Sequence, residues 1–101
     1  MNERQILALL KTGQVAFHYP LKVHYQPGEG EFGVSVPKRN FKRAVKRNLL
    51  KRRVREAFRL QKARLGDRSY DIFIYYISKE VEEYGRIEKS VAQVLDDLAS
   101  R

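Results

Sequence analysis

Residues 38–64 read KRNFKRAVKRNLLKRRVREAFRLQKAR, and this stretch determines the longest element of the fold. It holds 13 of the chain's 21 Lys and Arg residues but only one acidic residue, Glu56, so its net charge is +12. Neither Gly nor Pro occurs over residues 42–64, which predicts one long helix with Asn40 as its N-cap. Gly66 then ends the helical pattern.

The predicted helix has an apolar face and an opposite basic face. At about 100° per residue, four apolar side chains cluster on one side: Leu50, Val54, Ala57 and Phe58. The side chains opposite them lie within about 40° of one line: Asn48, Arg52, Arg55 and Arg59, with Lys51 at the edge. The apolar face is expected to pack on a sheet. The guanidinium groups of the other face are suited to paired contacts with phosphate oxygens.

The positive charge is confined to this segment, because the rest of the chain carries eight basic and 11 acidic residues. Focused positive charge attracts polyanions by releasing their counterions, and RNA or DNA is the usual polyanion. Most charge runs are simply solvated faces, but such faces normally mix both signs. Here Arg47, Lys51 and Arg55 repel one another at a spacing of four. Arg52 with Glu56 is the only compensated pair. Nucleic-acid binding is therefore favoured, with a basic helix on a membrane surface as the competing interpretation.

Asn48 stands in the middle of the basic face. Asn is a poor residue for a helix interior, because its side chain competes for local backbone hydrogen bonds. In this position it would orient a neighbouring arginine, contact RNA or bind a metal-bound water, or it is a tolerated surface residue. The spacing leaves both interpretations open.

The chain before the basic segment predicts one helix and two strands. Apolar residues at helical spacing predict a short amphipathic helix over residues 3–12. Residues 15–25 alternate with period two, which predicts one strand with a buried face, or two short strands broken near Pro20. The residues on the buried side of that pattern are Val15, Phe17, Tyr19, Leu21, Val23 and Tyr25. Residues 32–36 predict a further strand that stops before Pro37.

The chain after the basic segment predicts one strand and one helix. Residues 69–77 are rich in β-branched and aromatic side chains, as in a buried strand. A C-terminal helix follows, with an apolar stripe made by Ile87, Val91, Val94, Leu95 and Leu98. The order α-β-β-α-β-α predicts an α/β (α+β) fold, in which three helices cover a small sheet.

Composition predicts one domain over residues 1–101, because the chain is long enough for a single core and too short for two. The absence of Cys excludes disulfides and thiolate metal sites. The longest apolar run, residues 72–77, is far too short to span a membrane, and the N-terminus lacks the pattern of a secretory signal. We expect a cytoplasmic protein with no membrane partner and no small-molecule substrate.

Two runs of sequence are similar to a known family: FGVSVPKR at residues 32–39 and AVKRNLLKRRVREAF at residues 44–58. They resemble the protein component of bacterial ribonuclease P, whose long helix carries an Arg-Asn-x-x-Lys-Arg-x-x-Arg signature. This chain has the signature as Arg47, Asn48, Lys51, Arg52 and Arg55. The resemblance is strong over residues 31–60 and collinear over nearly the whole chain.

The resemblance implies a two-layer sandwich related to a ribosomal-protein domain, with a small mixed sheet and a left-handed β-α-β crossover. The general rule for such crossovers would give the opposite hand. It also implies that the chain is the accessory subunit of an endoribonuclease, ribonuclease P. In that family a catalytic RNA performs the hydrolysis with bound Mg²⁺, and the holoenzyme removes the 5′ leader of precursor tRNA.

The resemblance further implies two groups of RNA-contacting residues. The first would bind RNA: Lys38, Arg39, Lys46, Arg47, Asn48, Lys51, Arg52, Arg55 and Arg59. The second would line a leader cleft between the first helix and the sheet: Ile6, Leu10, Lys22 and His24. Relatives often have aromatic residues at such cleft positions and a basic stretch before the first helix, and this sequence departs from both patterns. Periodicity favours the core for Phe17, Tyr19 and Tyr25.

No catalytic or metal-ligating residues are expected in the protein itself. His18 and His24 fall on one face of the predicted strand about 20 Å apart, too far to share a metal ion. No carboxylates pair with a histidine as in a two-metal nuclease. A structural or ribosomal RNA-binding protein and a protein-only nuclease are the two alternative functions.

Overall fold

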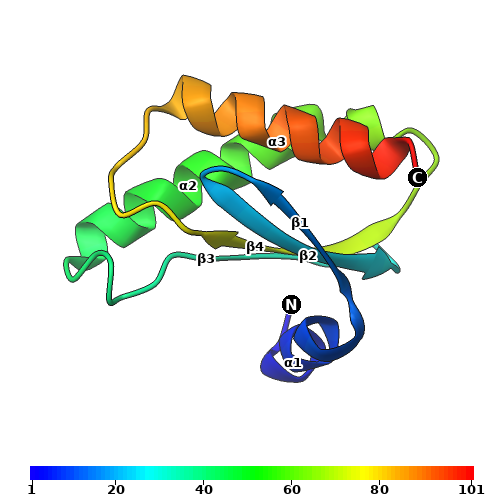
Figure 1. Cartoon of the computed structure of the whole chain (residues 1–101), viewed down its shortest axis with the longest axis horizontal. Helices are drawn as coiled ribbons and strands as arrows, with labels where there is room; N and C mark the ends of the chain where they lie inside the picture. Colours follow the sequence, from blue (N-terminus) through cyan, green and yellow to red (C-terminus); the bar gives the residue numbers. More distant parts are fainter.

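The computed structural model describes residues 1–101 and shows a four-stranded sheet with helices on both faces (Figure 1). The elements in chain order are α1 (Glu3–Thr12), β1 (Gln14–His18), β2 (Leu21–Pro27), β3 (Phe32–Ser35), α2 (Ala44–Gln61), the 3₁₀ helix η1 (Lys62–Leu65), β4 (Tyr70–Tyr76) and α3 (Tyr84–Ala99). The strands lie in the order β1-β2-β4-β3. Because β3 and β4 are parallel and the other two pairs are antiparallel, the sheet is mixed, as predicted.

The main core lies between one face of the sheet and the helices α2 and α3. The sheet contributes Leu21, Val23, Ile72, Ile74 and Tyr76, and the helices contribute Leu50, Val54, Ile87, Val91 and Leu95. All of these side chains are essentially inaccessible to solvent. The apolar stripe predicted for the C-terminal helix is confirmed, because each of its five residues is buried.

The long helix is confirmed, and its apolar face docks as predicted. Leu50, Val54 and Ala57 are fully buried. Phe58 stacks on Phe32 of β3, with 4.1 Å between the ring centroids and 14° between the ring planes.

The N-cap predicted for this helix is wrong. The chain makes a turn after Pro37, in which the Asn40 N–H donates to the Pro37 carbonyl at 3.2 Å. The helix therefore begins four residues later than Asn40, and its N-cap, Arg43, makes no side-chain capping bond.

The prediction of a single strand over residues 15–25 is wrong, and the alternative of two strands broken near Pro20 is right. β1 and β2 form a hairpin in which His18 pairs with Leu21, so that only Tyr19 and Pro20 form the loop. Across this two-residue loop, the odd-numbered residues of β1 lie on the same face of the sheet as the even-numbered residues of β2. The apolar residues of the sequence nevertheless stay at odd positions on both sides of the loop. The sheet consequently has one strand more than the predicted order.

This reversal puts the aromatic residues of the hairpin on different faces. Tyr25 is buried in the core, as predicted, whereas Phe17 and Tyr19 are 65% and 54% exposed, so their assignment to the core was wrong. The expectation that the two histidines share a face was also wrong. His18 Nε2 lies 3.5 Å from the Asp97 carboxylate of α3, and His24 faces the other side of the sheet.

On the other face of the sheet, α1 covers only part of the surface (Figure 1). The helix starts with a capping box between Asn2 and Gln5. The Gln5 side chain also contacts Glu31 at 3.3 Å. Gly33 allows a close approach here, because a Cβ at that position would meet the Phe73 ring at 2.7 Å. The uncovered remainder of this face is the floor of a cleft. None of the helices combines the length and the apolar character needed to cross a bilayer.

Candidate nucleic-acid interface

The outward face of α2 presents four exposed side chains, which we call the ridge: Asn48, Arg52, Arg55 and Arg59. The helix points its buried residues at the sheet and α3, so the ridge faces away from the rest of the protein. Arg52 and Arg55 pair with no carboxylate of this chain. Both guanidinium groups are therefore available to an external anion.

The pairing predicted between Arg52 and Glu56 does not form. Glu56 instead pairs with Arg59, one turn further along the same helix, where the Arg59 Nη2 atom lies 2.6 Å from the carboxylate. This leaves Arg52 without an internal partner and partly neutralises the C-terminal end of the ridge.

The other predicted RNA-binding residues lie outside the ridge. The Arg47 Nη1 donates to the carbonyls of Phe41 and Lys42 at 2.7 and 2.9 Å, so this side chain fastens the turn that precedes α2. Lys51 is half-buried at the flank. Lys46 borders a separate hollow between the start of α2 and Lys79 of the β4–α3 loop.

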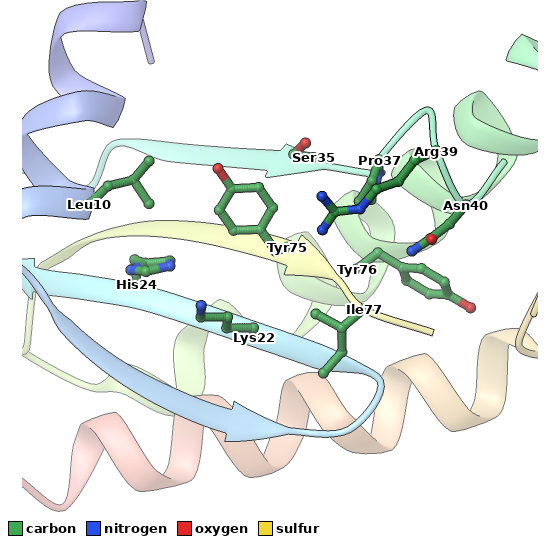
Figure 2. A pocket seen from close by; sticks show the side chains of 10 residues that line it. All are labelled: Leu10, Lys22, His24, Ser35, Pro37, Arg39, Asn40, Tyr75, Tyr76 and Ile77. Carbon is green, nitrogen blue, oxygen red and sulfur yellow. The ribbon is translucent and has the colours of Figure 1, made fainter. Parts of the chain in front are cut away.

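The second surface is a cleft of about 510 Å³ on the face of the sheet opposite α2 and α3. It is lined by Leu10, Lys22, His24, Ser35, Pro37, Arg39, Asn40, Tyr75, Tyr76 and Ile77. Figure 2 shows Leu10 of α1 at one end and Arg39 with Asn40 at the other, with Lys22, His24 and Tyr75 between them. The cleft therefore combines two cations with an aromatic floor.

Three of the four residues predicted for the leader cleft lie in this cavity: Leu10, Lys22 and His24. Ile6 does not line it, since only the last turns of α1 reach the cleft, and Ile6 lies one turn earlier. Arg39 joins the cleft from the turn after β3, whereas Lys38 in the same turn is exposed outside it.

Tyr75 is the cleft residue that the sequence did not reveal. Its ring packs edge-on against His24 at 5.7 Å and against Phe73 at 5.0 Å. Residues 72–77 are almost all apolar or aromatic, so the sequence predicts a strand buried on both faces. In the structure α1 covers Phe73, which is 6% exposed, but leaves Tyr75 partly open. The sequence holds no signal that separates Tyr75 from its neighbour Tyr76, which is fully buried.

His24 is a neutral polar group in the floor of the cleft. Burial lowers the pKa of its imidazole below the ordinary value, and the neighbouring Lys22 ammonium lowers that pKa further. Arg39, on the opposite wall, also carries positive charge. The ring is therefore uncharged at neutral pH.

This shift predicts a pH-dependent contribution to stability. As the pH falls below about 6.5, the unfolded chain protonates His24 while the folded chain does not, so the free energy of unfolding decreases until the pH reaches the lowered pKa. We expect wild type to lose more stability between pH 7.5 and pH 5 than His24→Phe, measured by urea unfolding at both pH values. Parallel losses in the two proteins would contradict the shift.

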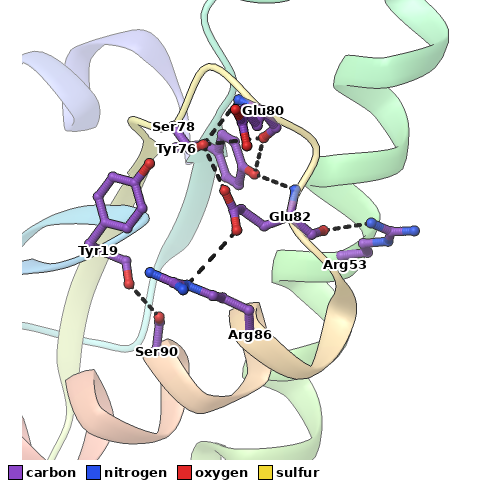
Figure 3. A network of polar contacts seen from close by, with 8 residues as sticks. All are labelled: Tyr19, Arg53, Tyr76, Ser78, Glu80, Glu82, Arg86 and Ser90. Carbon is purple, nitrogen blue, oxygen red and sulfur yellow. Dashed lines mark hydrogen bonds and ion pairs between the residues drawn. The ribbon is translucent and has the colours of Figure 1, made fainter.

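A polar network fixes the loop between β4 and α3 against α2 (Figure 3). The Tyr76 hydroxyl donates to the Glu80 carbonyl at 2.6 Å and accepts from the Glu82 N–H at 2.9 Å. From α2, Arg53 Nη1 donates to the Glu82 carbonyl at 2.6 Å. Arg53 thus has a positioning role inside the protein, although it belongs to the basic segment.

Carboxylates and histidines do not gather into a metal-binding group. The structure contains no set of three or more His, Asp or Glu side chains placed to hold a metal ion.

The chain is similar to known proteins over almost its whole length. A model of the family described as Ribonuclease P matches residues 1–99. The ribonuclease P protein component of Porphyromonas gingivalis is 35% identical over an alignment of 107 residues, gaps included. The alignment covers 94% of this chain and 78% of the relative. The chain belongs to the ribonuclease P protein family.

Solved ribonuclease P proteins have the same fold. The Staphylococcus aureus protein superposes with a TM-score of 0.82 at 22% identity, covering 96% of this chain and 91% of that one. The Thermotoga maritima protein also gives a TM-score of 0.82, at 23% identity, covering 96% and 94%. At such low identities, the similarity establishes a shared fold and nothing more. This shared fold confirms the predicted α+β class with three helices and a mixed sheet.

Family membership defines the role of the chain in outline. As a ribonuclease P protein component of the bacterial type, the chain is an accessory subunit of ribonuclease P, an endoribonuclease that acts in the 5′ processing of tRNA. It has an RNA partner in the ribonuclease P holoenzyme. A purely structural RNA-binding protein is not favoured.

Proposed function

We propose that the ridge binds the catalytic RNA of ribonuclease P while the cleft holds the 5′ leader of precursor tRNA. The observation that carries this proposal is the separation of the two surfaces. The ridge is the exposed face of α2, and this helix packs on one side of the sheet (Figure 1). The cleft opens on the other side of the sheet (Figure 2). One small protein can therefore contact two RNA segments at once.

The chemistry of each surface suits its proposed ligand. A rigid helix with unpaired arginines favours the closely spaced phosphates of a folded RNA, because guanidinium groups bind phosphate oxygens with paired donors. Single strands bind where aromatic rings stack on bases and cations follow the backbone. The cleft has both, with Tyr75 in its floor and Lys22 and Arg39 on its walls.

Mg²⁺, held mainly by the RNA subunit, would be the metal of the hydrolysis. The protein would support this chemistry by neutralising phosphates and lowering the amount of free Mg²⁺ that the RNA needs. Its location would be the cytoplasm, where tRNA precursors are made.

The test is reconstitution with the ribonuclease P RNA of the same cell. We expect the purified protein to restore 5′ leader cleavage at a low Mg²⁺ concentration where the RNA alone is inactive. Binding without restored cleavage would support a structural RNA-binding role, and cleavage by the protein without RNA would support a protein-only nuclease.

Tyr75→Ala should selectively weaken binding of substrates that carry a leader. Loss of one stacking platform typically costs about 1–3 kcal/mol per base. We expect the holoenzyme's Kd for precursor tRNA to rise, with its Kd for mature tRNA unchanged. Tyr75→Phe keeps the ring and serves as the control. Equal weakening for precursor and mature tRNA would contradict the proposed position of the leader in the cleft.

A further inference from the structure

The strand β1 forms one margin of the sheet, and no further strand lies along its outer edge (Figure 1). The direction of its backbone groups follows from β2. The Pro20 carbonyl accepts from the Ile77 N–H at 2.8 Å, so the even-numbered residues of β2 bond toward β4. Because hydrogen bonding alternates along a strand, the odd-numbered residues of β2 bond toward β1, where they face His18, Ala16 and Gln14.

Val15 and Phe17 consequently direct their N–H and C=O groups outward. No loop, cap or helix supplies a backbone bond to either residue. Native edge strands normally prevent further pairing by means of an inserted charge, a proline or a bulge. β1 has none of these, since its register is continuous and its one ionisable residue, His18, faces Asp97 of α3. The four outward groups are therefore open to one more strand.

The side chains along this edge determine the chemistry of such a strand. Val15 and Phe17 lie on the cleft face of the sheet, where they are 44% and 65% exposed. The Lys22 ammonium lies 5.6 Å from the centre of the Phe17 ring and pairs with no carboxylate. At the end of the hairpin, the Arg86 guanidinium lies 5.3 Å from the centre of the Tyr19 ring. An apolar residue opposite Val15, with acidic residues toward the hairpin end, would complement this edge.

Three kinds of occupant fit the edge to different degrees. The edge offers alternating donors and acceptors, which a peptide backbone matches at every second residue and a phosphodiester backbone does not. A second copy of the chain would bring an equal net charge of +9 to the same place. An acidic peptide satisfies both the hydrogen bonds and the charge.

We propose that β1 is a docking edge for a partner protein, which adds an extended segment of alternating apolar and acidic residues to the four-stranded sheet, antiparallel to β1. The segment would bind through backbone groups that neither the ridge nor the cleft uses. This inference goes beyond the RNA-binding roles proposed above and does not depend on them. It gives the ribonuclease P protein a place at which another protein joins the holoenzyme.

The experiment begins with a displayed library of short random peptides, selected on the reconstituted holoenzyme. We expect the selected peptides to alternate apolar and acidic residues. Phe17→Pro should weaken their binding by about ten-fold or more, because it removes one outward N–H and the apolar ring. The inward bonds of β1 remain, and proline is tolerated where the N–H of an edge strand faces solvent.

Three further variants separate the backbone from the side chain. Phe17→Ala keeps the outward N–H and should weaken binding less than Phe17→Pro does. Phe17→Glu keeps every backbone group but places a negative charge on the edge, so it should also weaken binding of the acidic peptides. Leu60→Glu makes the same change at an exposed apolar residue of α2 and should leave peptide binding unchanged. Melting temperatures of all variants show that they are folded.

Amide hydrogen exchange of the isotopically labelled full chain, followed by NMR, tests the added strand directly. In the free protein the amides of Val15 and Phe17 should exchange fast, and that of Ala16 should exchange slowly. A selected peptide should slow the exchange of Val15 and Phe17 by about ten-fold or more.

The other outcomes overturn the inference. The edge is not a docking site if the library yields no peptide that prefers wild type to Phe17→Pro. A peptide that binds without protecting the Val15 and Phe17 amides does not add a strand. If oligouridylate protects these amides and the selected peptides do not, the edge binds RNA rather than protein.

Discussion

Replacing Arg52 and Arg55 together by alanine is expected to weaken binding to the catalytic RNA by roughly 2–4 kcal/mol, or about 30- to 700-fold. Both side chains are exposed on the ridge, and neither has a carboxylate partner in the protein. Their contribution therefore goes to an external ligand rather than to the fold. The change is measured as the Kd for the isolated ribonuclease P RNA at fixed salt.

The salt dependence of the same binding gives a second measure. Each phosphate contact contributes roughly 0.7–0.9 to the slope of log K against log salt, so the double variant should lower that slope by about 1.5. The matched control is Arg64→Ala with Arg101→Ala, which removes two charges that lie outside the ridge and pair with Asp96 and Asp97 of α3. If this control weakens RNA binding as much as the ridge variant, net charge rather than the ridge is responsible.

Leu50→Ala is expected to lower the free energy of unfolding by about 2–5 kcal/mol, because it leaves a cavity where α2 docks on the sheet. Leu50 is fully buried in the core. Leu60 lies on the same helix and is 58% exposed, so Leu60→Ala should change stability by only about 0.5 kcal/mol. Urea unfolding followed by circular dichroism compares the two. Similar losses would mean that the buried face of α2 has been assigned incorrectly.

The ridge variants and Leu50→Ala test two different properties, which are RNA affinity and the stability of the fold. The ridge variants should leave the unfolding midpoint nearly unchanged and reduce RNA affinity. Leu50→Ala should reduce stability first, and RNA affinity only to the extent that α2 loses its support. A fixed helix is useful for RNA binding, since the backbone that carries the arginines need not be ordered when RNA binds.

Within the cleft, the sequence predicted some residues and concealed others. Lys22 and His24 were predicted from the resemblance, and the structure places them in the cavity. Tyr75 was concealed, because a strand that is apolar on both sides gives no sign of which side stays open. That distinction depends on α1, which shields Phe73 and stops short of Tyr75.

The sequence by itself determined the two faces of α2. Within one continuous helix the angular position of each side chain follows from its number alone, so Leu50 had to lie opposite Arg52 whatever surrounds them. The tertiary structure decided the faces of the N-terminal hairpin. There the two-residue loop between His18 and Leu21 moves the odd-numbered residues to the opposite face of the sheet, while the apolar residues stay at odd positions. It also decided the cleft, because Leu10, His24 and Tyr75 are far apart in the chain and meet only when the sheet forms.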